Sequence, residues 1–131
     1  MSQQEHAIKS LPEAVVAVIA RNNRVLLIQR GPDVPSAGYW APLSGKIEPK
    51  EGQVEALLRE VQEEVGLTVR PVRKVWENTA ASGSHKLHWW LAEWVSGELK
   101  LDPREVADAR WLGIPGVKTR VFRVEVGSGN V

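Results

Sequence analysis

The stretch from residue 45 to residue 67, GKIEPKEGQVEALLREVQEEVGL, constrains the fold more than any other part of this 131-residue chain. It opens with a loop that holds glycine and proline, and it continues as a helical pattern. Five apolar residues fall on one stripe of a helical wheel: Val54, Leu57, Leu58, Val61 and Val65. The sequence therefore predicts an amphipathic helix that packs through this stripe and ends at Gly66, a residue type common just past helix C-termini.

Three glutamates crowd a second face of the same helix. Glu60, Glu63 and Glu64 lie three and four residues apart, within an arc that we expect to lie well away from the apolar stripe. At about 4 Å and an effective dielectric of about 20, each close pair of carboxylates costs roughly 4 kcal/mol. An oxygen-preferring cation such as Mg²⁺ would offset this repulsion. The alternative is a solvated acidic surface, which is the commoner reason for such a cluster.

The spacing of the whole stretch favours the cation. Gly45, five residues, Glu51, seven residues and then the run REVQEEVGL from residue 59 resemble the signature box of the Nudix hydrolases without a departure. Composition alone would give such a match about once in a billion starting points. A looser similarity covers about residues 13 to 112, and the segment from 85 to 98 resembles the MutT branch, which hydrolyses nucleoside triphosphates.

The resemblance implies a fold and a metal site. The fold is the Nudix fold, in which a mixed β-sheet lies sandwiched between helices. In the family, the glutamates that match Glu60, Glu63 and Glu64 bind Mg²⁺, for which Mn²⁺ can substitute, and the carbonyl of the residue that matches Gly45 can join them. A glycine at that position lets the backbone approach the ion closely.

The same resemblance implies the catalytic residues, which are Glu63, Glu64, Arg59 and Glu51. Arg59 would fix a carboxylate through a charge-assisted hydrogen bond. Glu51 would help to shape the site, although a simple negative charge at the start of the helix is an equal alternative. The family's general base is sometimes a glutamate of the box and sometimes one on a later loop, where Glu98 and Glu105 are both candidates.

Two further residues are candidates for substrate binding. Arg30 precedes a loop where related hydrolases often place a basic contact, and Trp40 could stack on a base near the mouth of the site. A strand-end surface charge and an ordinary packing tryptophan are the alternatives. His85 and His88 are three residues apart, which places them on opposite faces of a strand and makes a shared metal site a poor expectation.

The remaining pattern predicts strands around the one helix, and hence an α+β domain. Two apolar runs at 15–20 and 24–30 flank an Asn-Asn pair and predict a β-hairpin. Loops are expected at 31–38 and 80–85, and strands at 67–76, 88–95 and 120–126. The piece at 40–43 is short and apolar, and the segment at 105–111 is ambiguous, with a turn followed by a strand as one reading. The last 20 residues lack a clear helical stripe, so the family's usual C-terminal helix is expected to be short, displaced or missing.

Length and charge bound the remaining possibilities. The chain is long enough for one domain over residues 1–131, with loose ends at 1–11 and 127–131. It has no cysteine, which excludes disulfides and thiolate metal sites and favours the cytoplasm. A net charge of +1 offers no footprint for duplex nucleic acid, and no apolar run is long enough for a membrane helix. We expect a small-molecule nucleotide as the partner, and a monomer or homodimer.

These observations predict a nucleotide pyrophosphohydrolase. The first hypothesis is an Mg²⁺-dependent hydrolase that cleaves a phosphoanhydride bond of a nucleoside triphosphate or a related nucleoside diphosphate derivative. The second is a hydrolase of a dinucleotide polyphosphate or a nucleotide sugar. The third belongs to another class, a non-catalytic Nudix module that senses nucleotides, which the loss of a box carboxylate would favour. All of the box carboxylates are present.

Overall fold

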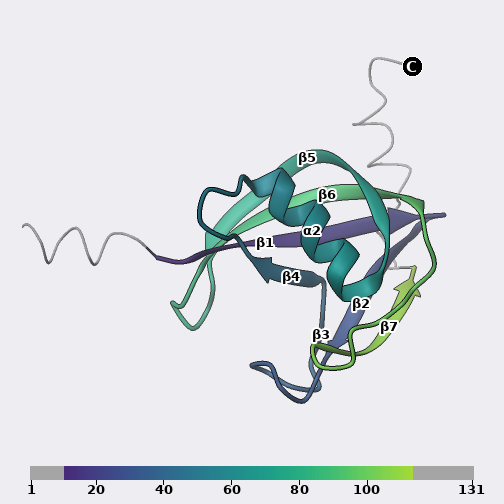
Figure 1. Ribbon diagram of the computed structural model, residues 1–131, viewed down its shortest axis with the longest axis horizontal. Coiled ribbons are helices and arrows are strands. Elements are labelled where there is room, and N and C mark those ends of the chain that lie inside the picture. The colour runs from purple at the N-terminus through teal and green to yellow at the C-terminus, as the bar shows by residue number, and fades with distance from the viewer. Residues whose placement is uncertain (1–10, 114–131) are drawn as a thin grey trace, which may run out of the picture.

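The computed structural model describes residues 11–113, and within them one helix packs on a mixed sheet of seven strands (Figure 1). The elements in chain order are β1 (Glu13–Arg21), β2 (Arg24–Arg30), β3 (Trp40–Ala41), β4 (Leu43–Lys46), α2 (Gln53–Val65), β5 (Thr68–Thr79), β6 (Lys86–Ser96) and β7 (Val106–Leu112). No helix in this part of the chain is both long and apolar enough to cross a membrane. The predicted α+β class is confirmed.

The first two strands form the predicted hairpin. Asn22 and Asn23 occupy the two turn positions with φ values of 50° and 64°, and Arg21 pairs directly with Arg24 across the turn. Two consecutive residues with positive φ match the right-handed twist of the flanking strands, and asparagine tolerates this conformation better than most residues. The Asn-Asn pair therefore fixes both the length of the turn and the register of the hairpin.

The sheet runs in the order β3-β2-β1-β6-β5, with β4 also beside β1 and β7 also beside β2. β1 and β6 are parallel, whereas the other pairs are antiparallel. The extended segments expected at 67–76 and 88–95 are β5 and β6, and the segment at 105–111 is a turn followed by β7. The strand expected at 120–126 and the question of a C-terminal helix lie outside the described residues.

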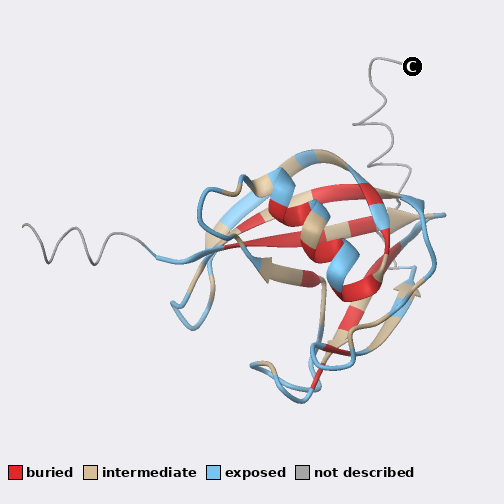
Figure 2. Cartoon of the chain, in the orientation of Figure 1, coloured by how far each residue is buried: buried red, intermediate tan, exposed pale blue. Residues whose placement is uncertain are grey.

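Helix α2 covers one face of the sheet, and its buried side is rotated from the predicted stripe (Figure 2). Leu57, Val61 and Val65 are fully buried as expected. Val54 and Leu58 are instead 37% and 39% exposed, while Glu60 and Glu64 are buried. The expectation that the acidic arc lies well away from the apolar stripe is therefore wrong for these two glutamates.

The ends of α2 explain how a short loop leads into it. Gly52 precedes the helix, and its backbone N–H donates to the Glu55 carboxylate at 2.7 Å. Gly66 closes the helix in the left-handed conformation with φ 72°, and its N–H donates to the carbonyl of Gln62. The predicted role of Gly66 is confirmed, because this conformation strains residues that carry a side chain.

Candidate functional site

A bidentate ion pair joins the loop before α2 to the helix itself. Arg59 Nε and Nη2 donate to the two carboxylate oxygens of Glu51 at 2.7 and 2.9 Å, and Nη2 also donates to the carbonyl of Lys46 at 2.9 Å. The backbone N–H of Glu48 donates to the same Glu51 carboxylate. These bonds, from Arg59 first and Glu48 second, lower the pKa of Glu51 to about 2. Glu51 is therefore more than a helix-start charge, since it fixes Arg59 between the loop and the helix.

The same arginine reaches two of the clustered glutamates. Arg59 Nη1 lies 3.1 Å from Glu63 Oε1 and 3.2 Å from Glu60 Oε2. The Glu63 side chain is 58% exposed, whereas that of Glu60 is 12% exposed. The Arg59 guanidinium thus offsets the charges of Glu60 and Glu63. Glu64 has no equivalent partner among these contacts.

Glu64 is the most deeply buried member of the cluster, at 3% exposure. Burial first, and then a hydrogen bond with Glu60 and the Glu60 charge, raise the pKa of the Glu64 carboxyl well above its usual range. The charge of Arg30 acts in the opposite direction but is the smallest of these influences. Among the neighbouring carboxyl groups, Glu60 therefore has the largest influence on the pKa of Glu64.

Gly45 in β4 makes room for this buried pair. A Cβ atom at Gly45 would overlap the side chain of Glu60, including its carboxyl group. Because the glycine has no side chain, the backbone of β4 lies directly against the carboxylate. The predicted metal-site residues Gly45 and Glu60 are thus in contact, at the point where β4 passes α2.

A cavity of about 670 Å³ opens over this acidic cluster. Of the residues singled out by the sequence, it is lined by Arg30, Gly45, Arg59, Glu60, Glu63, His85 and Glu105. Glu64 and Glu51 lie behind this lining rather than on it. Lys46 and Ser44, which the sequence did not single out, also contribute to the wall, and only their position in β4 next to Gly45 could have indicated them.

The structure distinguishes the two loop glutamates. Glu105 lines the cavity, and burial first, followed by the charge of Glu60, raises the pKa of its carboxyl. Glu98 is exposed in the loop after β6 and does not line the cavity. Glu105 lies 45 positions after Glu60 in the sequence. The paired β2 and β7 strands, together with the hydrogen bond from the Asp102 N–H to the Glu64 carbonyl, bring it to the site.

Of the two residues predicted to bind substrate, one lines the cavity and the other does not. Arg30 lines the cavity and donates to the carbonyl of Pro35, which holds its side chain against the 31–38 loop. Trp40 lies in β3 under the Arg110 guanidinium, 5.4 Å from the ring centre, and is not part of the cavity wall.

The two histidines do not share a strand as predicted. His85 precedes β6 and lines the cavity, while His88 is buried within β6, 2.6 Å from Glu13. The reason is that β6 begins only at Lys86, so His85 belongs to the loop. The strand-face argument that set these residues apart in the sequence was therefore wrong.

The donor set of the cavity fits a divalent cation of the Mg²⁺ type. Carboxylate oxygens and a backbone carbonyl are hard ligands of the kind that Mg²⁺ prefers. Within residues 11–113 no three acidic or histidine side chains converge into a ready-made cage. Glu63 is turned toward Arg59 but is largely exposed. Burial and the neighbouring Glu60 favour the protonated form of Glu64, so a bound cation would take the place of that proton.

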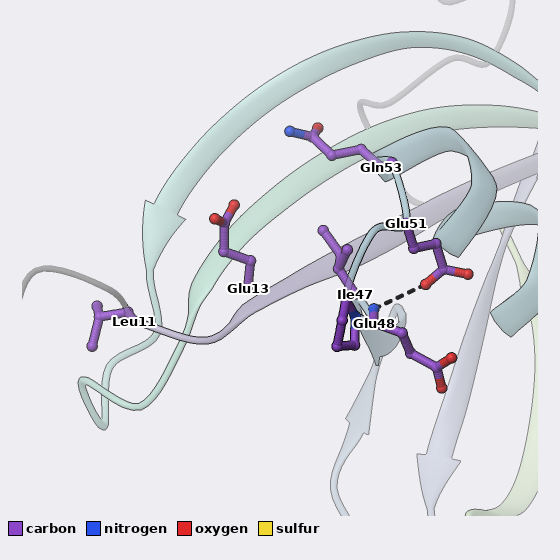
Figure 3. Close-up of a pocket in the computed structure, with 8 residues that line it drawn as sticks. Leu11, Glu13, Ile47, Glu48, Glu51 and Gln53 are labelled. Carbon is purple, nitrogen blue, oxygen red and sulfur yellow. Dashed lines mark hydrogen bonds between the residues drawn. The ribbon is translucent and has the colours of Figure 1, made fainter. Parts of the chain in front are cut away.

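A second hollow of about 740 Å³ lies beside the loop that leads into α2 (Figure 3). Its wall combines Leu11, Ile47 and Pro49 with Glu13, Glu48, Glu51, Gly52 and Gln53. Among residues 11–113, none of those that line it is basic, whereas Arg30, Lys46 and Arg59 line the first cavity. The first cavity is therefore the better candidate for a phosphate-bearing ligand.

Comparison with known proteins finds relatives that are named as hydrolases of nucleotides or nucleotide-capped RNA. It is 33% identical over 101 residues to an NAD-capped RNA hydrolase NudC from Pseudomonas entomophila, which covers 77% of this chain and 36% of the relative. It is 46% identical over 55 residues to a CTP pyrophosphohydrolase from Escherichia coli, covering 42% of this chain and 41% of the relative. The matched segments thus span well under half the length of these curated relatives.

A solved structure and a family model agree with these matches. A MutT NUDIX hydrolase from Burkholderia pseudomallei superposes with a TM-score of 0.66 at 28% identity, covering 89% of this chain and 96% of that one. The model of the NUDIX domain matches residues 10–124. The chain belongs to the Nudix hydrolase family, as the box around Gly45 and Glu64 indicated.

Proposed function

We propose that the chain is an Mg²⁺-dependent hydrolase, active in the cytoplasm, that cleaves a phosphoanhydride bond of a nucleoside triphosphate or a related nucleoside diphosphate derivative. The observation that carries this proposal is the buried Glu60–Glu64 pair against Gly45, at the base of a cavity that also holds cationic side chains. A bound divalent cation would neutralise phosphate charge and orient the phosphate chain. Glu60, Glu63, Glu64 and the Gly45 carbonyl would hold it.

The chain's own cations would position the substrate. Arg30 and Lys46 line the cavity from β2 and β4 and would bind phosphate oxygens. Arg59 would keep Glu63 and Glu60 in place, and its bidentate pair with Glu51 would hold the loop that follows Lys46. Trp40 lies outside the cavity wall, so Arg30 is the stronger of the two predicted substrate contacts.

Glu105 is the better of the two loop glutamates for proton transfer. It lines the cavity with Glu60 and Glu63, and burial, followed by the charge of Glu60, raises the pKa of its carboxyl. A carboxyl with a raised pKa is better matched to accept a proton from water near neutral pH than an ordinary surface glutamate. We therefore assign the general base to Glu105 or to a glutamate of the box, and we set Glu98 aside.

A second candidate function is hydrolysis of a dinucleotide. The relative from Pseudomonas entomophila is named for NAD-capped RNA, which contains a dinucleotide pyrophosphate, and its match covers more of this chain than that of the CTP pyrophosphohydrolase. A nucleotide sugar has the same diphosphate core. The alternatives differ only in the group beyond the second phosphate, which the loops at 31–38 and 80–85 would contact.

The test is a substrate screen with Mg²⁺ and with Mn²⁺. It compares nucleoside triphosphates, NAD, ADP-ribose, dinucleotide polyphosphates, nucleotide sugars and NAD-capped RNA, and reads the release of phosphate, pyrophosphate and nucleoside monophosphate. We expect cleavage between phosphates of at least one class. Folded protein that cleaves none of them with either cation would support the nucleotide-sensing module instead.

A further inference from the structure

A cationic hollow lies at the turn between β1 and β2, and it is separate from the acidic cavity. The hollow has a volume of about 370 Å³ and is lined by Arg21, Asn22, Arg24 and Trp111. Because the turn contains only Asn22 and Asn23, Arg21 and Arg24 are placed directly opposite one another. The hairpin geometry therefore places the two arginines at one small hollow.

This placement has an electrostatic cost. Like charges directly opposite one another on paired strands are destabilising. Neither arginine forms an ion pair with an acidic side chain of residues 11–113. Elsewhere in the same part of the chain, arginines do have such partners, as Arg70 has in Glu93 and Arg104 in Asp102. An anion bound between Arg21 and Arg24 would remove this repulsion.

Two tryptophans give the region its shape. The Arg21 guanidinium carbon lies 3.7 Å from the ring centre of Trp94 and 5.8 Å from that of Trp111. Trp94 is itself held by a hydrogen bond from its indole N–H to the carbonyl of Gly97. Cation–π contacts of this kind hold the guanidinium in place. Arg21 is thus a fixed cation beside an indole, while Arg24 is exposed.

The hollow is remote from the acidic cavity. Ala14 lines that cavity and Arg21 lines the hollow, and both lie in β1. Seven residues of strand at about 3.3 Å each separate them by roughly 23 Å. Figure 1 shows the β1–β2 turn at the end of β1 far from β4, and none of the residues that line one region lines the other.

We propose that Arg21, Arg24 and Trp111 form a second binding site, for the phosphate and base of a nucleotide unit in single-stranded nucleic acid. Paired guanidinium groups match the geometry of a phosphate, and an adjacent indole offers a surface for a base that is not paired. This combination of charge and flat ring distinguishes the ligand from a simple anion. The proposal is independent of the reaction proposed for the acidic cavity.

The experiment measures binding of a fluorescent oligouridylate of about eight nucleotides by anisotropy, in chelator and at low salt, so that no turnover occurs. The informative variant is Arg24→Glu, because the new carboxylate would pair with Arg21 across the turn and preserve the hairpin. We expect its affinity to fall at least about 10-fold and its dependence on salt to weaken. Its circular dichroism spectrum and its rate on a mononucleotide substrate should equal those of the wild type.

The matched control is Lys100→Glu, which makes the same change in net charge at an exposed position after β6. Equal losses in the two variants would overturn the site, since net charge alone would then explain binding, and so would no loss in Arg24→Glu. Arg24→Ala serves as a second variant, with a smaller expected loss.

Unlabelled competitors distinguish three possible ligands, which are inorganic phosphate, a free nucleotide and single-stranded nucleic acid. Inorganic phosphate that competes as well as uridine monophosphate would overturn the nucleotide assignment. If uridine monophosphate competes as well as the unlabelled oligonucleotide, the assignment to single-stranded nucleic acid is overturned, and the ligand is a free nucleotide. We expect the oligonucleotide to compete best. Loss of catalysis with intact oligonucleotide binding would count against the proposed reaction and leave this site unaffected.

Discussion

At the scale of single residues, the site depends on the absence of a side chain at Gly45. The Glu60 carboxyl occupies the space that a Cβ atom would fill, and Glu64 lies buried beside it. The sequence identified all three residues through the box, but it placed the carboxylates on an exposed arc. Their burial could not be predicted, because a helical wheel shows spacing and does not show which neighbouring strand lacks a side chain.

Gly45→Ala is expected to destabilise the protein by about 1–3 kcal/mol, the usual effect of forcing an extra group into a packed region. The clash would displace Glu60, so activity should fall as well. Chemical denaturation measures the first effect and steady-state kinetics the second. Ser44→Ala, at the neighbouring position of β4, is the control. Wild-type stability in Gly45→Ala would mean that β4 and α2 are not in close contact.

Replacing Glu63 by Gln should lower turnover by roughly 100-fold or more, because it removes one anionic ligand from a catalytic cation. Folding should change little, since the Glu63 side chain is largely exposed. Glu55 is a poor control because its carboxylate accepts the Gly52 N–H at the start of α2. Glu98→Gln is better, since Glu98 is exposed and outside the cavity. Equal, small effects of the two substitutions would indicate a solvated helix face.

At the scale of elements, the loop from 46 to 51 and helix α2 act as one unit. Arg59 joins them through Glu51 and the carbonyl of Lys46. The sequence predicted the loop, the helix and its end at Gly66, and it predicted the β1–β2 hairpin from Asn22-Asn23. These features depend on local chemistry, which a sequence shows directly. The pairing of β4 with β1 and of β7 with β2 depends on contacts distant in sequence, and it was not predicted.

Arg59→Lys tests this unit. Lysine keeps the charge but cannot donate two parallel hydrogen bonds to Glu51 while also reaching Lys46. We expect faster hydrogen exchange of the backbone N–H groups of residues 48–52 and a lower melting temperature. Exchange in β5 and β6 should not change in native conditions. If the 48–52 amides exchange at the wild-type rate in Arg59→Lys, the ion pair does not hold the loop.

At the scale of the whole molecule, the cavity combines segments that lie far apart in the chain. Arg30, the 80–85 loop and Glu105 meet over α2 only because β1 joins β2, β4 and β6 within one sheet. The box predicted the acidic half of the cavity. The other half was only partly accessible from the sequence, where Arg30 and Glu105 were single candidates among alternatives.

The burial of Glu64 predicts how stability depends on pH without a divalent cation. Its pKa is raised above the ordinary value of 4.5, so the folded state retains a proton that the unfolded chain releases. This contribution to stability is fully present below about pH 4.5 and is lost as pH rises toward the raised pKa. Glu51 acts oppositely, because its pKa of about 2 stabilises the fold above pH 4.5 and this stabilisation is lost toward pH 2.

In chelator, the melting temperature should therefore fall as the pH rises from 5 to 8. In Glu64→Gln, the melting temperature should depend less on pH. Saturating Mg²⁺ should raise the melting temperature more at pH 8 than at pH 5, since the cation favours the ionised carboxylates. An Mg²⁺ effect of the same size at both pH values, or in a variant with Gln at 60, 63 and 64, would place the ion elsewhere.

The most direct test of the central claim is the rate of nucleotide hydrolysis as a function of cation concentration, measured on the best substrate of the screen. We predict no turnover in chelator and a saturable return of activity with Mg²⁺ or Mn²⁺. In Glu64→Gln, the same titration should require a higher concentration and reach a much lower maximum rate. Full turnover in chelator, or an unchanged titration in Glu64→Gln, would contradict the assignment of the acidic cavity as the metal-dependent active site.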